Sequence, residues 1–227
     1  MIKALVFDLD GTLLNTLSAL RLSISLTMQA LGLGELDEEH TKAFVGEGYQ
    51  KLLERSLVYL GDEKMEKLQE SMSLYQKFFQ ENCMEGVHPY EGILQLLDYG
   101  KKKGLKLAVL SNKLQHRVED NIFQIFGKEM FDMVYGERPG IPMKPDPTGL
   151  KLLIQELQAA PKEVLYMGDT DTDIKTGQGA SVNTVGVAWG FRSREVLEAC
   201  RPDYLVNSPE EIISLLQSKE LIQWKQK

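Results

Sequence analysis

The chain has few cysteines and few histidines. Its two cysteines, Cys83 and Cys200, lie far apart without a CxxC motif, and its three histidines do not form HExxH or a similar spacing. A disulfide framework needs several spaced cysteines, and a zinc site needs clustered cysteine or histidine ligands. The sequence therefore disfavours both, and we expect two buried, reduced thiols.

Long apolar runs and an excess of basic residues are also missing. No uninterrupted apolar run exceeds four residues, which is too short for a membrane-spanning helix or the apolar part of a secretory signal. Acidic residues outnumber basic ones, 33 to 26, so the formal net charge is −7. Such a charge provides no attraction to nucleic acid or to anionic membranes. We expect a cytoplasmic protein that binds neither.

Six short runs rich in apolar and β-branched residues predict strands. Amphipathic segments of helix length lie between most of them, for example 90–103 and 147–157. This alternation is typical of a parallel sheet that helices cover on both sides. We predict an α/β fold, with a Rossmann-like parallel sheet core and helices on both faces. The predicted strands are 2–8, 105–111, 131–135, 163–168, 184–188 and 203–206.

One interval, 16–82, lacks a predicted strand and shows helical periodicity throughout. We predict that it is an all-helical domain inserted into an α/β core made of 1–15 and 83–227. The insertion follows the first strand, where open α/β sheets bind ligands. A helical subdomain that only adds core is the alternative. The predicted helices are 17–31, 38–45, 49–60 and 62–80.

Two carboxylates follow the first strand, in the segment Asp8-Leu9-Asp10-Gly11-Thr12. The two-residue period of a strand places Asp8 and Asp10 on the same side of the backbone, and Gly11 permits a sharp turn. The alternative is that these residues only end the strand.

A second acidic cluster, Asp169, Asp171 and Asp173, follows a later strand. Acids at alternating positions repel one another unless a cation lies between them. Carboxylates with few other protein ligands suit Mg²⁺ better than Ca²⁺. An EF-hand loop is disfavoured because its sixth position is Ile174 instead of glycine. The two acidic clusters together therefore predict a magnesium site.

Two further segments carry groups that suit anionic oxygens. Ser111 and Asn112 follow the apolar run 107–110 of a predicted strand and provide a hydroxyl, an amide and backbone N–H groups. Lys144 lies in a Lys-Pro-Asp-Pro segment, whose prolines restrict the backbone beside the lysine. The alternatives are an N-cap for the next helix and a solvated loop lysine.

The order of these motifs resembles the haloacid dehalogenase superfamily. DxDGT stands at 8–12, a serine at Ser111, a lysine at Lys144 and GDxxxD at 168–173. All four motifs are intact and in order, and the resemblance extends from residue 2 to about residue 215. It implies the same fold and hydrolase chemistry.

The resemblance assigns roles to the site residues. Asp8 is the expected nucleophile, which forms an aspartyl-phosphate, and Asp10 is the expected general acid and base. Dehalogenases and phosphonatases of the superfamily lack an acid at the place of Asp10, so phosphate ester hydrolysis is favoured. Mg²⁺ is expected on Asp8, the backbone carbonyl of Asp10 and Asp169, with support from Asp173. The expected phosphate-binding residues are Gly11, Thr12, Ser111, Asn112 and the catalytic Lys144.

The insert resembles the small helical cap of this superfamily. Its segment 44–57 is similar to the VGxGxxxLLxRAL stretch of phosphoglycolate phosphatases, which makes Gly46, Glu47 and Gly48 the expected substrate loop. Asn15-Thr16 and Ser56 depart from the usual residues of the family.

We expect a phosphatase for a small phosphorylated metabolite such as 2-phosphoglycolate, acting as a monomer or weak homodimer. Three alternatives stay open at this point. The first is a phosphatase for other sugar phosphates, nucleotides or pyrophosphate. The second is a phosphotransferase like β-phosphoglucomutase, and the third is a binding protein without turnover.

Overall fold

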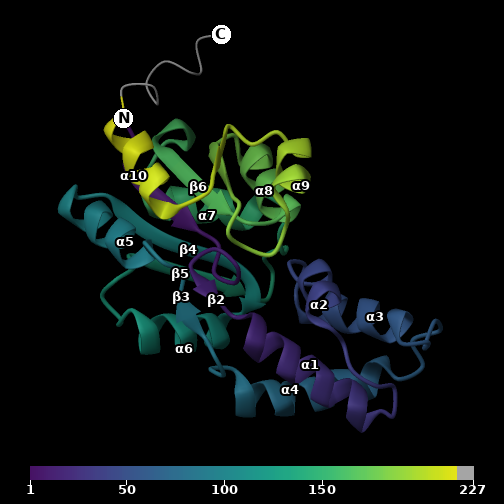
Figure 1. Cartoon of the computed structure of the whole chain (residues 1–227). Helices are drawn as coiled ribbons and strands as arrows, with labels where there is room; N and C mark the ends of the chain where they lie inside the picture. The colour runs from purple at the N-terminus through teal and green to yellow at the C-terminus, as the bar shows by residue number, and fades with distance from the viewer. Residues whose placement is uncertain (219–227) are drawn as a thin grey trace. The chain divides into compact units, whose positions relative to one another are not determined.

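The computed structural model describes residues 1–218 and divides the chain into two compact units (Figure 1). The α/β unit contains Met1–Leu13 and the chain from Pro89 onward, and the helical unit contains Leu14–His88. These bounds lie within a few residues of the expected insert. That the helical unit acts as a cap stays a prediction.

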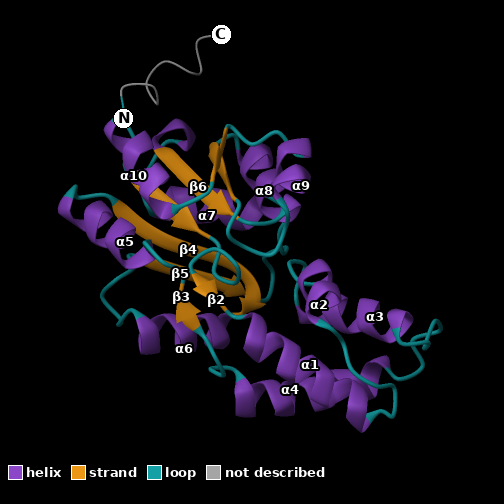
Figure 2. Ribbon diagram, viewed as in Figure 1, coloured by secondary structure: helices purple, strands orange, loops and turns teal. Residues whose placement is uncertain are grey.

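The α/β unit is built on a six-stranded sheet in which every neighbouring pair is parallel (Figure 2). Each strand overlaps a run predicted from the sequence, so the α/β fold is confirmed. The strands, in spatial order, are β5 (Met133–Glu137), β4 (Lys106–Leu114), β1 (Ala4–Phe7), β6 (Val164–Gly168), β7 (Asn183–Val187) and β8 (Tyr204–Val206).

Helices cover both faces of this sheet, as predicted. On one face, Val6 and Tyr166 pack in an apolar cluster with residues of α7 (Thr148–Glu156) and α8 (Asp171–Ala180). On the other face, Leu5 and Leu107 reach Gly100 of a further helix. The remaining helices are α5 (Ile93–Lys102), α6 (Gln115–Ile125), the 3₁₀ turn η1 (Pro161–Glu163), α9 (Arg194–Ala199) and α10 (Pro209–Gln217).

Strand register brings the motifs to one edge of the sheet. Phe7 of β1 pairs with Val109 of β4 on one side and Met167 of β6 on the other. Because the strands are parallel, the residues that follow these three end at the same edge. Figure 1 shows β1, in purple, between the teal β4 and the green β6.

The helical unit contains four helices close to the predicted positions. They are α1 (Leu17–Ala30), α2 (Glu38–Phe44), α3 (Tyr49–Tyr59) and α4 (Leu68–Asn82), and the short strands β2 (Leu14–Asn15) and β3 (His88–Pro89) pair at the ends of the segment. The expected start of the fourth helix at residue 62 was wrong. Asp62 instead accepts the backbone N–H groups of Glu66 and Lys67, and left-handed residues at 61 and 65 interrupt helical geometry.

Both cysteines are free thiols, but the prediction that they are buried was wrong. Cys83 and Cys200 are half-buried because each is the residue at the C-terminal end of a helix, α4 and α9. Among residues 1–218, helices long and apolar enough to cross a membrane are absent.

Candidate functional site

A buried lysine joins two of the predicted acids. Lys144 Nζ lies 2.8 Å from Asp8 Oδ1 and 2.6 Å from Asp173 Oδ1. All three residues are at least nine-tenths buried. Asp8 follows β1, Asp173 lies in the first turn of α8 and Lys144 precedes α7. The sheet edge therefore assembles one charge cluster from three distant segments.

Asp169 lies in the same cluster, and its carboxylate is held from two sides. Thr12 Oγ1 donates to Oδ1 at 2.9 Å, and the Phe191 N–H donates to Oδ2 at 2.8 Å. Gly11 has a φ of +84°, and a Cβ at this position would clash with the Asp169 carboxylate. Glycine is therefore required at this position both for the turn and for the close approach of Asp169.

Thr12 lies beside Asp169. Its hydroxyl donates to Asp169 and its N–H donates to Leu9 O at 3.3 Å, and its expected binding of phosphate stays a prediction. Its carbonyl accepts Trp189 Nε1 at 3.0 Å. Trp189 and Phe191 lie in the loop after β7 and hydrogen-bond to Thr12 and Asp169. The sequence did not indicate that this loop contributes to the site.

Asp173 is saturated with hydrogen bonds. Besides Lys144, Oδ1 accepts the Tyr166 hydroxyl at 2.8 Å, and Oδ2 accepts the Thr170 N–H at 3.1 Å and its hydroxyl at 2.6 Å. The Thr170 contacts form a capping box at the start of α8. Asp171 is the first residue of α8 and instead pairs with Lys175. Only two of the three acids of this motif therefore belong to the cluster.

Asn112 positions the lysine. Its side-chain amide donates to Lys144 O at 2.9 Å and accepts the Lys144 N–H at 2.8 Å. The amide expected to bind phosphate is thus engaged by the lysine backbone. Ser111 belongs to β4 and is buried, so it is not an N-cap, and its Oγ accepts the Lys113 N–H at 3.2 Å. In this contact Ser111 Oγ is the acceptor, and the expected binding of phosphate by Ser111 stays a prediction.

Asp10 has a cationic neighbour that the sequence did not indicate. Lys113 Nζ donates to Asp10 Oδ1 at 2.8 Å, and the two side chains are 9% and 15% exposed. The register shift between Leu110 and Leu114 of β4 lies around this lysine. A pair between residues so far apart in the sequence cannot be predicted from the local sequence pattern.

The acidic residues fit a divalent cation. Asp8, Asp169 and Asp173 offer carboxylate oxygens within 4.8 Å of one another. Asp173 has its acceptors occupied, whereas Asp8 Oδ1 is buried without an aligned hydrogen bond. With Asp10 included, the site contains four carboxylates and two ammonium groups, those of Lys113 and Lys144. Its formal charge is therefore −2. One divalent cation would neutralise this charge.

Burial and mutual repulsion oppose ionisation of two of these acids. Burial, together with Asp173, raises the pKa of Asp169 to about 7. Burial raises the pKa of Asp8 well above its usual value, and Asp173 and Asp169 add to the effect while Lys144 opposes it. Burial lowers the pKa of Lys144, but Asp173 and Asp8 outweigh it, so the net shift is upward. The lysine therefore stays charged.

Stability in a chelator is expected to fall as pH rises. With a folded-state pKa of about 7, Asp169 holds its proton more tightly in the folded state than in the unfolded chain, whose pKa is about 4. Folded protein then binds more protons between about pH 4 and pH 7, and ionisation costs up to about 4 kcal/mol. Thermal unfolding in EDTA from pH 5 to pH 8 measures this loss.

The matched control for this prediction is Asp169→Asn, which keeps a side chain of similar shape without the titration. Its unfolding temperature is expected to vary less between pH 5 and pH 8. Equal pH dependence in the wild type and the variant would contradict the assignment to Asp169.

The predicted substrate loop lies between α2 and α3 of the helical unit. Gly46 and Gly48 have φ values of 122° and 85°, which favour glycine. Arg55, from α3, donates to Phe44 O at 2.9 Å and pairs with Glu47. Arg55 thus contacts the last residue of α2 and the middle of the loop. Its role toward a substrate stays a prediction.

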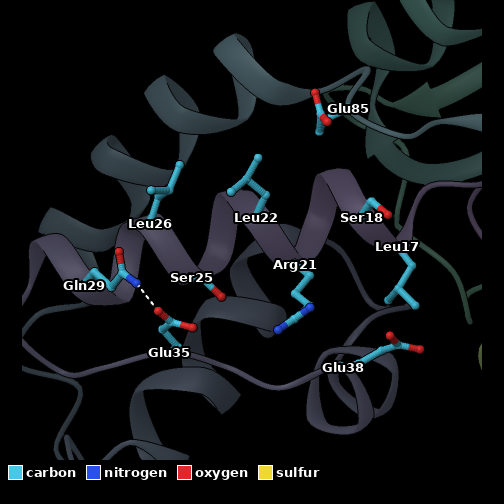
Figure 3. A pocket seen from close by; sticks show the side chains of 10 residues that line it. All are labelled: Leu17, Ser18, Arg21, Leu22, Ser25, Leu26, Gln29, Glu35, Glu38 and Glu85. Atoms are coloured by element: carbon cyan, nitrogen blue, oxygen red, sulfur yellow. Dashed lines mark hydrogen bonds between the residues drawn. The ribbon is translucent and has the colours of Figure 1, made fainter.

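A separate hollow of about 370 Å³ follows α1 within the helical unit (Figure 3). The substrate loop does not line it. Arg21 projects from α1 into the hollow, and the acidic residues Glu35, Glu38 and Glu85 also line the hollow. This hollow is therefore a poor match for an anionic substrate.

Comparisons with known proteins agree with the motifs. The family model of the haloacid dehalogenase-like hydrolases matches residues 5–187. A phosphoglycolate phosphatase of Aquifex aeolicus is 31% identical over 95% of this chain and 97% of its own. A pyrophosphatase, PpaX, of Bacillus mycoides is 29% identical over 95% of this chain and 97% of its own.

Solved structures include a similar fold. The crystal structure of a candidate phosphoglycolate phosphatase from Lactobacillus delbrueckii subsp. bulgaricus superimposes with a TM-score of 0.88. The two chains are 26% identical, and the match covers 94% of this chain and 98% of the other.

Proposed function

Because the chain belongs to the haloacid dehalogenase-like hydrolases, we propose that it is a Mg²⁺-dependent phosphatase that acts through an aspartyl-phosphate on Asp8. The observation that carries the proposal is the position of Asp8. It is buried at the end of β1, beside Lys144 and within 4.8 Å of two further carboxylates. Burial beside a lysine and two further acids supports a role for this carboxylate in covalent chemistry.

The first step uses Asp8 and Asp10. An oxygen of Asp8 forms a bond to the phosphorus while the bond from phosphorus to the ester oxygen breaks. Asp10, two residues on, gives its proton to the departing oxygen. In the second step Asp10 takes a proton from water, whose oxygen attacks the phosphorus and releases phosphate and Asp8. The partly exposed side chain of Asp10 suits exchange with water.

Lys144 and Ser111 hold the transferred phosphoryl group. Lys144 brings a fixed positive charge, which Asn112 keeps in position through both backbone groups of the lysine. Bound Mg²⁺, on Asp8, the Asp10 carbonyl and Asp169, would supply charge neutralisation for the phosphoryl oxygens. Asp173 orients Lys144 and keeps it between the two acids.

The substrate we propose is a small phosphorylated metabolite such as 2-phosphoglycolate. The support is the 31% identical phosphoglycolate phosphatase and the Gly46–Gly48 loop, whose backbone amides suit a small carboxylate. Pyrophosphate is the second candidate, because a relative of nearly equal identity is a pyrophosphatase. A phosphotransferase would pass the phosphoryl group to a second hydroxyl instead of to water.

The test is phosphate release from a panel of phosphates in Mg²⁺ and in EDTA. We expect turnover of p-nitrophenyl phosphate and 2-phosphoglycolate in Mg²⁺, a loss of at least about 100-fold in EDTA, and recovery when Mg²⁺ is returned. An enzyme that keeps its activity after chelation would contradict the metal assignment. Transfer of labelled phosphate to a sugar hydroxyl, with little release to water, would favour the phosphotransferase.

A further inference from the structure

Lys113 lies beside Asp10, the expected general acid. The side chain extends from the end of β4 and is 9% exposed, and its Nζ lies 2.8 Å from Asp10 Oδ1. A buried ammonium group is costly unless anionic oxygens surround it. Its neighbour Asp10 is, in the proposed function, the group that touches the departing oxygen. Lys113 is therefore placed to meet whatever is attached to that oxygen.

The distances limit which part of the substrate Lys113 can meet. Two successive hydrogen bonds, from Lys113 to Asp10 and from Asp10 to the departing oxygen, place the ammonium within about 8 Å of that oxygen, whichever carboxylate oxygen Asp10 uses. A charged group must therefore lie within a few bonds of the departing oxygen to reach Lys113. A phosphate ester of a long neutral alcohol offers no such group.

The relatives named above act on substrates that share this property. In 2-phosphoglycolate the leaving glycolate carries a carboxylate one carbon from the ester oxygen, and in pyrophosphate the leaving group is itself a phosphate. The other lysine of the site, Lys144, lies between Asp8 and Asp173. Lys113 lies beside Asp10, which in the proposed function faces the leaving group.

We propose that Lys113 binds the negative charge of the leaving group, an inference that rests on the proposed function. It thereby selects phosphate esters and anhydrides whose leaving group is anionic close to the bridging oxygen. Lys113 would then be a specificity-determining residue supplied by the α/β unit itself, in addition to the expected loop of the helical unit.

The test compares 2-phosphoglycolate with 2-hydroxyethyl phosphate, a neutral-leaving-group ester of similar length. For the wild type we expect kcat/KM at least about 30-fold higher with 2-phosphoglycolate, the size of one charge-assisted hydrogen bond. Lys113→Met should reduce this preference to about threefold or less, and Lys113→Arg should keep part of it. Lys175→Met, which removes an exposed lysine of α8, is the matched control and should keep the preference.

Two kinetic results would overturn the role of Lys113 in leaving-group selection. If Lys113→Met lowers kcat/KM for both esters by the same factor, Lys113 acts only through Asp10 and the inference is overturned. Equal use of both esters by the wild type overturns it as well. Far-UV circular dichroism of Lys113→Met and Lys113→Arg shows whether each variant is folded. A loss of preference in a folded variant is then not caused by misfolding.

A binding measurement tests the inference without turnover. In Asp8→Asn protein, calorimetry should show at least about tenfold tighter binding of 2-phosphoglycolate than of 2-hydroxyethyl phosphate, and Lys113→Met in the same background should abolish the difference. Equal binding of the two esters overturns the inference. Absence of turnover of every ester by the wild type overturns the proposed function alone, since the binding result stands independently.

Discussion

Asp8→Asn is expected to lower kcat by at least about 10⁴-fold while the protein stays folded. An amide cannot form the bond to phosphorus, and loss of a nucleophile costs factors of this size or more in other hydrolases. Stability should not fall, because Asp8 lies beside Asp169 and Asp173 and its burial and their charges raise its pKa. The neutral amide relieves this repulsion. Steady-state kinetics and thermal unfolding in EDTA measure the two effects.

The matched control is Asp171→Asn, in the same acidic motif. Asp171 pairs with Lys175 at 2.6 Å and lies outside the cluster. Near-full activity is expected, since removing an exposed helix pair changes little. Full activity of Asp8→Asn, or an equal loss in both variants, would remove the basis for assigning the nucleophile to Asp8.

Lys144→Met is expected to lower both activity and stability. The substitution leaves Asp8 and Asp173 buried without their shared cation, a change that costs about 3–5 kcal/mol in other proteins. For a chain of this size such a loss lowers the unfolding temperature by roughly 10 °C. We also expect kcat to fall by at least about 100-fold, because the phosphoryl group loses a fixed charge. Denaturant unfolding and kinetics measure both.

Two comparisons separate this effect from the general effect of removing a lysine. Lys175→Met breaks an exposed pair and should change the free energy of unfolding by less than about 0.5 kcal/mol. Lys144→Met combined with Asp173→Asn should be more stable than Lys144→Met alone by at least about 1 kcal/mol, because one buried charge is gone. A double variant less stable than the single one would show that the Asp173 charge does not cause the loss.

The fold was predictable because its signals are local. Each buried strand is a short apolar run, and each polar motif follows such a run, so parallel pairing alone places Asp8, Ser111 and Asp169 at one edge. Helix periodicity likewise located α1, α2 and α3. The start of α4 was missed because the side chain of Asp62 competes for backbone N–H groups that a helix would use.

The contacts inside the site were less predictable, because they join segments that pattern does not relate. Asn112 could bind either a phosphate or the backbone of Lys144, and the residue type fits both. Nothing in the sequence at the end of β4 shows that Lys113 pairs with Asp10. The loop with Trp189 resembles any strand-to-helix connection, and its hydrogen bond to Thr12 exists only after β7 has docked.

The interrupted α/β unit also determines when the site can form during synthesis. Thr12 and Asp169 are hydrogen-bonded across 157 residues of chain, with the helical unit between them. Closing so long a loop costs chain entropy that is recovered only when β6 pairs with β1. The helical unit is contiguous in sequence and can complete its contacts on the ribosome first. A growing chain that ends before Asp169 therefore contains Asp8 and Lys144 without Asp169 and Asp173, the two acids that complete the cluster.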